Sequence, residues 1–147
     1  MPMLVTPIAG RVVDRIGGRP LLAAGLALQA IGLLWMAVVA APGVAYLELV
    51  PAFVISGVGM SLFFVPVASV VLGSVRPAEE GVASGTNNAF RELGGVFGIA
   101  VLGSVFSAAG SYTSGSTFVA GLIPAVATGA AVVGLGALVA LVCRRPR

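Results

Sequence analysis

Long apolar segments alternate with short polar stretches along the whole of this chain. Four of these segments are long enough to cross a membrane, because a helix rises about 1.5 Å per residue and the hydrocarbon core of a bilayer is about 30 Å thick. They are residues 21–41, 49–75, 81–109 and 118–142. The sequence therefore predicts an all-α integral membrane protein in which residues 1–147 form a single membrane domain.

The two ends of the chain differ from these four spans. Residues 1–10 are apolar but too short to span, since ten helical residues rise only about 15 Å. In a signal peptide positive charge precedes the apolar core, whereas here the arginines follow it. We therefore interpret residues 1–10 as the end of a membrane helix, residues 11–20 as a polar loop and residues 143–147 as a polar tail.

Two of the spans are irregular. Residues 49–75 are longer than a straight crossing needs, and Pro51 and Pro66 are the expected points of bending. Within residues 81–109 the charged pair Arg91 and Glu92 interrupts the apolar pattern. This predicts an amphipathic inner segment that continues into the membrane.

The positive charges fall on alternate connections. All eight basic residues are arginines, and they lie in residues 11–20, at positions 76 and 91, and in the C-terminal tail. The connections at residues 42–48 and 110–117 contain none. Short loops rich in arginine and lysine stay in the cytoplasm. This predicts a multi-pass protein of a bacterial cytoplasmic membrane with a cytoplasmic C-terminus.

Composition narrows the possible functions. Hydrophobic residues make up 59% of the chain and charged residues 9%, which is typical of a membrane protein. The net charge of +3 is placed at the membrane edges rather than on one basic face, so nucleic-acid binding is not expected. With no histidine and a single cysteine, Cys143, neither a metal site, a bound cofactor nor a catalytic Ser-His-Asp or Cys-His group is expected. The sequence does not indicate an enzyme.

Small residues recur four positions apart within the spans. Such spacing lets helix backbones approach closely in lipid, where packing rather than hydrophobicity drives association. The pairs are Gly94 with Gly98, Gly57 with Ser61, and Ala130 with Gly134. Helix packing is the interpretation that we favour for them.

The loop between the half-helix and the first full span carries a specific pattern. It reads Gly10-x-x-x-Asp14-Arg15-x-Gly17-x-Arg19. A carboxylate there can accept hydrogen bonds from free backbone N–H groups at a helix start, although an ordinary positively charged inner loop is the simpler interpretation of the arginines alone. The whole pattern resembles the loop signature of the major facilitator superfamily.

A second segment supports this resemblance. Residues 81–98, GVASGTNNAFRELGGVFG, are similar to the entry to the penultimate pair of helices in the fourteen-helix drug:proton antiporters of the EmrB/QacA type. The resemblance identifies the chain as a C-terminal fragment of such a protein, with residues 1–10 ending helix ten and the four spans forming helices eleven to fourteen.

The resemblance implies proton-coupled export of drugs or other amphipathic molecules by alternating access. It implies that the motif loop is an inner latch between the two halves of the transporter, with Asp14 as the latch carboxylate and Arg15 and Arg19 as its charged partners.

It also suggests residues that line the substrate cavity. Phe64 and Ser56 lie on the span whose counterpart borders that cavity, although packing or lipid contact explains a single phenylalanine as well. Asn87 either lines the path or caps an interfacial helix. Arg91 either faces the cavity or anchors its helix at the inner interface.

The chain departs from the family pattern in two ways. It lacks the first half of the transporter, and none of its five acidic residues falls in the middle of a span, where a proton relay needs an ionisable group. Its expected partners are the bilayer, an amphipathic substrate, protons, and either the missing N-terminal helices or a second chain. Two alternatives stay open: an independent four-span exporter acting as a dimer, and a non-transporting membrane scaffold.

Overall fold

The computed structural model describes residues 18–72 and 75–142, and the regular structure of these residues is entirely helical. Four helices within this part are long and apolar enough to cross a membrane, which confirms the prediction of an all-α membrane protein. The elements are α2 (Gly18–Val39), α3 (Tyr46–Leu72), the short 3-10 helix η1 (Pro77–Glu79), α4 (Glu80–Ala109) and α5 (Gly115–Val142).

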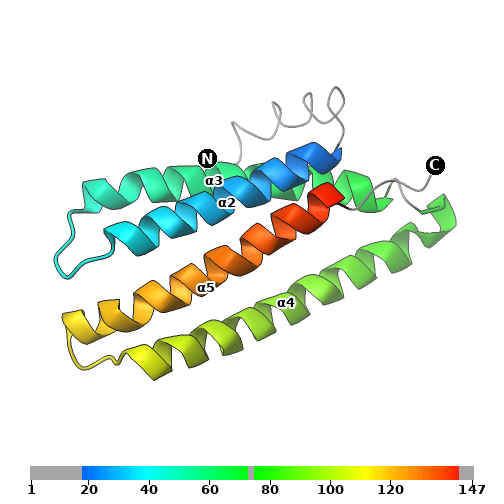
Figure 1. Cartoon of the computed structure of the whole chain (residues 1–147). Helices are drawn as coiled ribbons and strands as arrows, with labels where there is room; N and C mark the ends of the chain where they lie inside the picture. Colours follow the sequence, from blue (N-terminus) through cyan, green and yellow to red (C-terminus); the bar gives the residue numbers. More distant parts are fainter. Residues whose placement is uncertain (1–17, 73–74, 143–147) are drawn as a thin grey trace.

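The long helices lie side by side along one direction (Figure 1). The α2–α3 and α4–α5 connections are at one end of the bundle, and the start of α2, the α3–α4 connection and the end of α5 are at the other. The most extensive interfaces are those of α2 with α3 and with α5, whereas α4 packs on α5 and touches α3 little. Helix α2 is therefore the centre of the bundle.

The helix ends differ from the predicted spans by a few residues. Helix α2 begins at Gly18 rather than Leu21, and α3 begins at Tyr46 rather than Leu49. Between them the chain turns at Gly43, whose φ of 81° lies in the left-handed region that favours glycine. Helix α3 is assigned as one helix that includes Pro51 and Pro66.

Helix α4 is also continuous, and it passes through Arg91 and Glu92 without a break. Just before it, the backbone N–H of Arg76 donates to Oε2 of Glu79 at 3.4 Å, and the N–H of Glu79 donates to the carbonyl of Arg76 at 2.8 Å. The 30 residues of α4 would extend about 45 Å, which is longer than a hydrocarbon core of about 30 Å is thick.

Small side chains form most of the buried core. The buried apolar residues are Leu21, Ala23, Ala30, Ala37, Ala52, Phe106, Ala125, Ala130 and Ala137. Alanine at these positions allows the helix axes to come close together, and the resulting backbone packing replaces the large hydrophobic core of a soluble protein.

Two of the three predicted small-residue pairs differ in whether another helix packs against them. Ala130 is buried, and a Cβ atom added to Gly134 would lie 3.9 Å from Cβ of Ala30. Ser61 is buried and donates to the carbonyl of Gly57 at 2.9 Å, but nothing lies within 4 Å of a Cβ added to Gly57. Only one residue of this pair is therefore packed: Ser61 is buried, whereas Gly57 has open space beside it.

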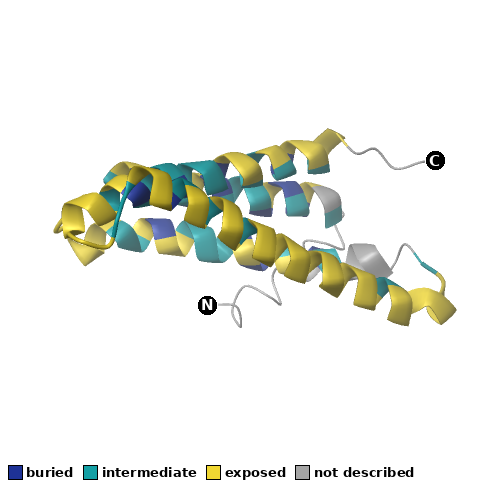
Figure 2. Ribbon diagram, turned by 90° about the horizontal axis from the view of Figure 1, so that it is seen from below, coloured by how far each residue is buried: buried dark blue, intermediate teal, exposed yellow. Residues whose placement is uncertain are grey.

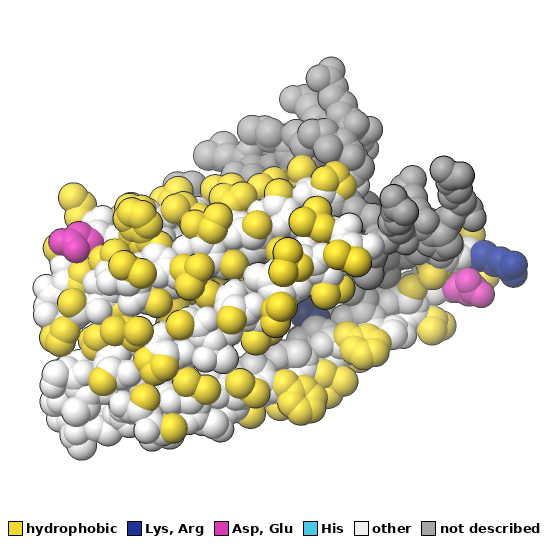
Figure 3. Space-filling model, viewed as in Figure 1, with side chains coloured by type: hydrophobic (Ala, Val, Ile, Leu, Met, Phe, Trp, Pro, Cys, Tyr) yellow, Lys and Arg dark blue, Asp and Glu magenta, His cyan; other side chains and the backbone are white. Residues whose placement is uncertain are grey.

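The outer surface of the described bundle is mostly apolar. Yellow hydrophobic side chains cover the long sides in Figure 3, and acidic side chains lie at both ends. Figure 2 shows that α4 is the most exposed helix. Large side chains such as Val82, Phe97 and Ile99 are exposed there by 74%, 68% and 77%, so most of α4 has no covering helix among the described residues.

Candidate functional site

The candidate site on α4 is a polar segment in the half of the helix nearer the α3–α4 connection. Nη2 of Arg91 donates a hydrogen bond to Oδ1 of Asn88 at 2.9 Å and lies 3.5 Å from Oε1 of Glu92. Positions three apart are neighbours on a helix surface, so the sequence places the Asn88 amide beside Arg91. The ion pair is solvent-accessible on both sides, with side-chain exposures of 58% and 72%, and it contributes little stability.

Helical spacing relates this segment to the face of α4 that packs on α5. A Cβ atom added to Gly129 of α5 would lie 3.7 Å from Cδ2 of Leu102, so Leu102 marks that face. Steps of four, seven and four residues back along the helix lead to Gly98, Arg91 and Asn87, which share one stripe because these steps are close to whole helical turns. We call Asn87, Arg91, Gly98 and Leu102 the α4 stripe.

The stripe is covered only toward the α4–α5 connection, where Gly98 and Leu102 are half-buried. Phe106 is the single buried residue of α4, and Asn87 and Arg91 are exposed. Nothing lies within 4 Å of a Cβ added to Gly94 or to Gly98. The helix-packing role predicted for these two glycines therefore stays a prediction, which requires a partner other than the described helices.

The other two cavity candidates lie on α3. Ser56 is half-buried in the α2–α3 interface, where a Cβ atom added to Gly32 would meet its Oγ. Phe64 is 41% exposed, and its ring contacts Phe63 edge to face at a centroid distance of 5.6 Å. Since α4 packs mainly on α5, the four candidates Ser56, Phe64, Asn87 and Arg91 do not gather into one cluster in the described bundle.

The motif loop lies almost wholly outside the described residues. This holds for Gly10, Asp14, Arg15 and Gly17. Arg19 lies in the first turn of α2. The latch role of this loop stays a prediction.

One polar residue was not anticipated from the sequence. Gln29 lies near the middle of α2, and its Oε1 atom is buried without a hydrogen-bond partner among the described residues. It is the only glutamine in the chain. Its position could have been noticed in the sequence, because Gln29 is an amide within the apolar span 21–41. Burying such a group without a hydrogen bond is costly, which marks it as a candidate for a specific role.

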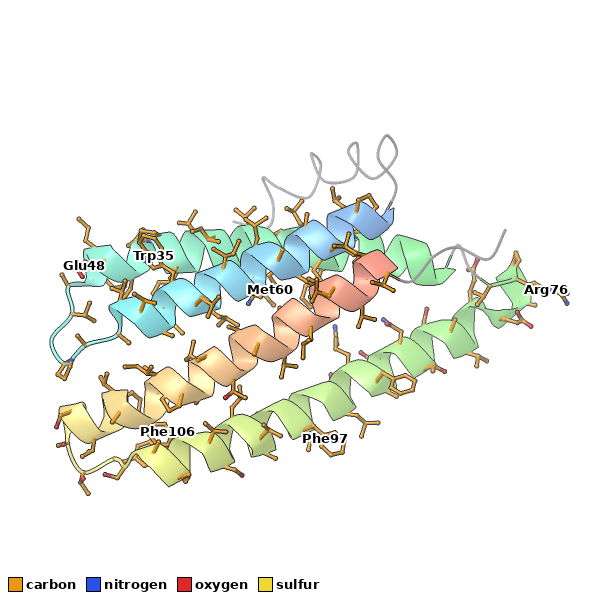
Figure 4. The ribbon with its side chains drawn as sticks, in the orientation of Figure 1. Trp35, Glu48, Met60, Arg76, Phe97 and Phe106 are labelled. Carbon is orange, nitrogen blue, oxygen red and sulfur yellow. The ribbon has the colours of Figure 1, made fainter. Side chains whose placement is uncertain are left out.

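Aromatic side chains lie at both the α2–α3 and the α4–α5 connection, which share one end of the bundle. Phe106 lies 4.9 Å from Tyr112 and 5.3 Å from Phe118, measured between ring centroids. On the α2–α3 hairpin, Nε1 of Trp35 donates to the carbonyl of Glu48 at 3.4 Å. Figure 4 shows Trp35 and Glu48 close together at this end, with Arg76 at the far end of the bundle.

Within residues 18–72 and 75–142, no group of three or more His, Cys, Asp or Glu side chains could hold a metal ion. The described geometry is thus that of a multi-pass helical membrane protein with polar residues on one incompletely covered helix. Such an arrangement is typical of transport proteins, in which polar residues of a span face other helices or a water-filled path.

Comparison with known proteins identifies the family. The family model described as "Major Facilitator Superfamily" matches residues 1–147, and the chain belongs to that family. Its members are transporters rather than enzymes. This confirms the resemblance based on the motif loop and on residues 81–98. No solved structure matches the chain.

Several curated relatives carry names of exporters. The chain is 44% identical over 107 residues to the cephamycin export protein CmcT of Amycolatopsis lactamdurans, covering 71% of this chain and 21% of the relative. It is 37% identical over 105 residues to the multidrug resistance protein Stp of Mycobacterium tuberculosis (71% and 19%). It is 29% identical over 97 residues to the multidrug export protein EmrB of Haemophilus influenzae (66% and 19%). The matches cover about a fifth of these relatives' length.

Proposed function

We propose that this chain is the C-terminal part of a major facilitator exporter that moves drugs or other amphipathic small molecules out of the cell by alternating access, in exchange for protons. The printed names of the relatives, which include a cephamycin exporter and two multidrug proteins, support the substrate class. The length of those relatives supports a larger transport unit than these residues.

The incomplete covering of α4 is the observation that carries this proposal. Helix α4 is long and apolar enough to cross a membrane, yet it buries only Phe106 and exposes the polar residues Asn87 and Arg91. Polar and charged groups within a span normally face other helices or a water-filled cavity, because their exposure to lipid is costly. Further helices facing the α4 stripe would give these residues such surroundings.

In this proposal the α4 stripe borders the substrate path at the boundary with the missing helices. Asn87 and Arg91 provide hydrogen-bond donors on α4, and the partly exposed Phe64 is the candidate from α3. Ser56 lies between α2 and α3 and so is not placed on this path. Apolar sites with a few polar groups suit amphipathic ligands.

Glu48 and Glu80 lie in the first turns of their helices and Glu79 lies in η1, whereas Glu92 lies inside α4 and pairs with Arg91. In this proposal the proton-carrying carboxylate belongs to the remaining helices of the transporter.

The same proposal fixes an orientation. Arg76 and Glu48 lie at opposite ends of the bundle (Figure 4), and arginine-bearing loops stay in the cytoplasm. The ends of α3 and α5 would then be inside and both hairpin connections outside, in the cytoplasmic membrane of a bacterium. The loop at residues 10–19 would lie inside, where Asp14 acts as the latch carboxylate with Arg15 and Arg19.

The test combines the size of the native product with its transport activity. The chromosomal gene is tagged at its 3′ end, membranes are run on a denaturing gel, and efflux of a cationic dye is measured with and without a proton gradient. A product several times larger than 14.6 kDa with gradient-dependent efflux supports the proposal.

Other outcomes would support the open alternatives. Efflux by residues 1–147 alone would indicate an independent exporter that acts as a dimer. A stable complex with an unrelated membrane protein and no efflux would indicate a scaffold. Either result contradicts the proposal.

A further inference from the structure

A buried hydrogen-bond acceptor lies on α2 near its crossing with α3. Gln29 lies in the middle of α2, and its side-chain oxygen is buried with no donor among the described residues. A buried acceptor without a donor is costly, and such groups are commonly satisfied by ordered water. We therefore expect the hydrogen-bond donor to Gln29 to lie between α2 and α3.

Pro66 of α3 supplies a second free acceptor. Proline has no N–H group, so the carbonyl of Leu62, four residues earlier, loses its usual helical donor. Pro66 is almost completely buried, so bulk water does not reach its surroundings. A Cβ atom added to Gly25 of α2 would lie 3.0 Å from the carbonyl carbon of Leu62. The Leu62 peptide therefore lies against α2.

Gln29 lies one helical turn after Gly25 on α2. A Cβ atom added to Gly59 of α3 would lie 2.7 Å from the backbone nitrogen of Gln29, and one added to Gly25 would lie 2.8 Å from the carbonyl oxygen of Gly59. Side chains on a helix tilt toward its N-terminus, so the Gln29 side chain reaches the level of Gly25, which lies against the Leu62 peptide.

We propose that Gln29 and the Leu62 carbonyl bind one water molecule between α2 and α3 in the middle of the membrane. The water donates one hydrogen bond to Oε1 of Gln29 and the other to the Leu62 oxygen. Oε1 of Gln29 and the Leu62 oxygen are both neutral acceptors, so a ligand that binds these two atoms must be a donor. The close approach of the Gly25 and Gly59 backbones limits it to a small one.

Water-edited solid-state NMR tests the site directly. Because Gln29 is the only glutamine of the chain, glutamine labelled with ¹³C gives one side-chain signal for residues 1–147 in lipid bilayers. Magnetisation transfer from water to Gln29 Cδ is expected to build up about as fast as transfer to the side chain of Trp35, which is 46% exposed at the outer end. Slow transfer would show a dry amide and overturn the proposal.

A proline substitution tests the second ligand. Pro66→Ala restores an N–H donor to the Leu62 carbonyl and should slow the transfer to Gln29 about threefold or more, since a buried water needs at least two polar partners. Pro124→Ala is the matched control, because Pro124 lies inside α5, and it should leave the transfer unchanged. An unchanged transfer rate in Pro66→Ala would show that the Leu62 carbonyl does not bind the water. If that variant does not fold, the transfer rate measured on the wild-type chain still tests whether Gln29 is hydrated.

Discussion

Gly25 of α2 and Gly59 of α3 lie so close together that a Cβ atom added to Gly25 would be 2.8 Å from the carbonyl oxygen of Gly59. A Cβ atom added to Gly59 would in turn be 2.7 Å from the carbonyl oxygen of Gly25. Neither neighbour is the flexible end of a side chain, so the backbones themselves must move to admit a larger residue. This contact sets the spacing of the two helices.

Replacing Gly59 should therefore weaken the α2–α3 pair. We expect Gly59→Leu to lower the stability of the detergent-solubilised protein by about 1–3 kcal/mol or more, the range for overpacked sites. Gly57→Leu is the matched control on the same helix, because nothing lies within 4 Å of a Cβ at that position. Thermal unfolding followed by the fluorescence of Trp35, the single tryptophan, measures both. Equal losses in the two variants would contradict the role of the crossing.

The α4–α5 hairpin should depend on Phe106. This ring is buried between Tyr112 and Phe118, and Phe106→Ala should cost about 3–5 kcal/mol, as for other buried phenylalanines. Phe97→Ala, on the same helix but 68% exposed, should have little effect on the stability of residues 1–147. Protease resistance of the hairpin connection in detergent provides the measurement, and a resistant Phe106→Ala protein would show that the aromatic contacts are dispensable.

The orientation can be tested with single cysteines in a Cys143→Ser background. A cysteine at Ser114, in the connection before α5, should react with a membrane-impermeant thiol reagent added to intact cells. A cysteine at Ala78, in η1, should react only after the cells are opened. The reverse pattern of labelling would invert the topology that the arginines predict.

The α4 stripe predicts a difference between two faces of one helix. In the native transporter, a cysteine at Asn87 should react with a small water-soluble thiol reagent, and substrate should slow the reaction. Val96, nine residues further along α4, points to the opposite side of the helix and is 65% exposed. A cysteine there should react much more slowly because it faces lipid. Equal reactivity without substrate protection would exclude the stripe from the substrate path.

The motif loop makes a prediction about transport rather than stability. Asp14→Asn should leave expression and insertion unchanged and reduce efflux by the native product about tenfold, because hydrogen bonds to charged groups contribute about 1.5–3 kcal/mol. Glu48→Gln, which changes an exposed carboxyl at the other end of the bundle, is the control and should retain efflux. Normal efflux by Asp14→Asn would refute the latch role.

The sequence alone determined the fold class, the approximate spans and the family. A bilayer demands about 20 apolar residues for each helical crossing, so each span is a local property that a single sequence can show. The motif loop and residues 81–98 are likewise continuous segments, and the family match over residues 1–147 confirms the resemblance that they carry.

Only the tertiary structure decided which small residues pack. Apart from the polar segment of α4, these helices are apolar on all faces, so hydropathy does not distinguish a buried face from one in lipid, and glycines occur on both. Gly25 and Gly59 meet at a crossing, whereas Gly57, Gly94 and Gly98 face open space within the described helices. The positions of the Leu62 peptide against Gly25 and of the Gln29 backbone nitrogen against Gly59 are likewise relations between two helices. They depend on how α2 and α3 cross, and neither span contains that information by itself.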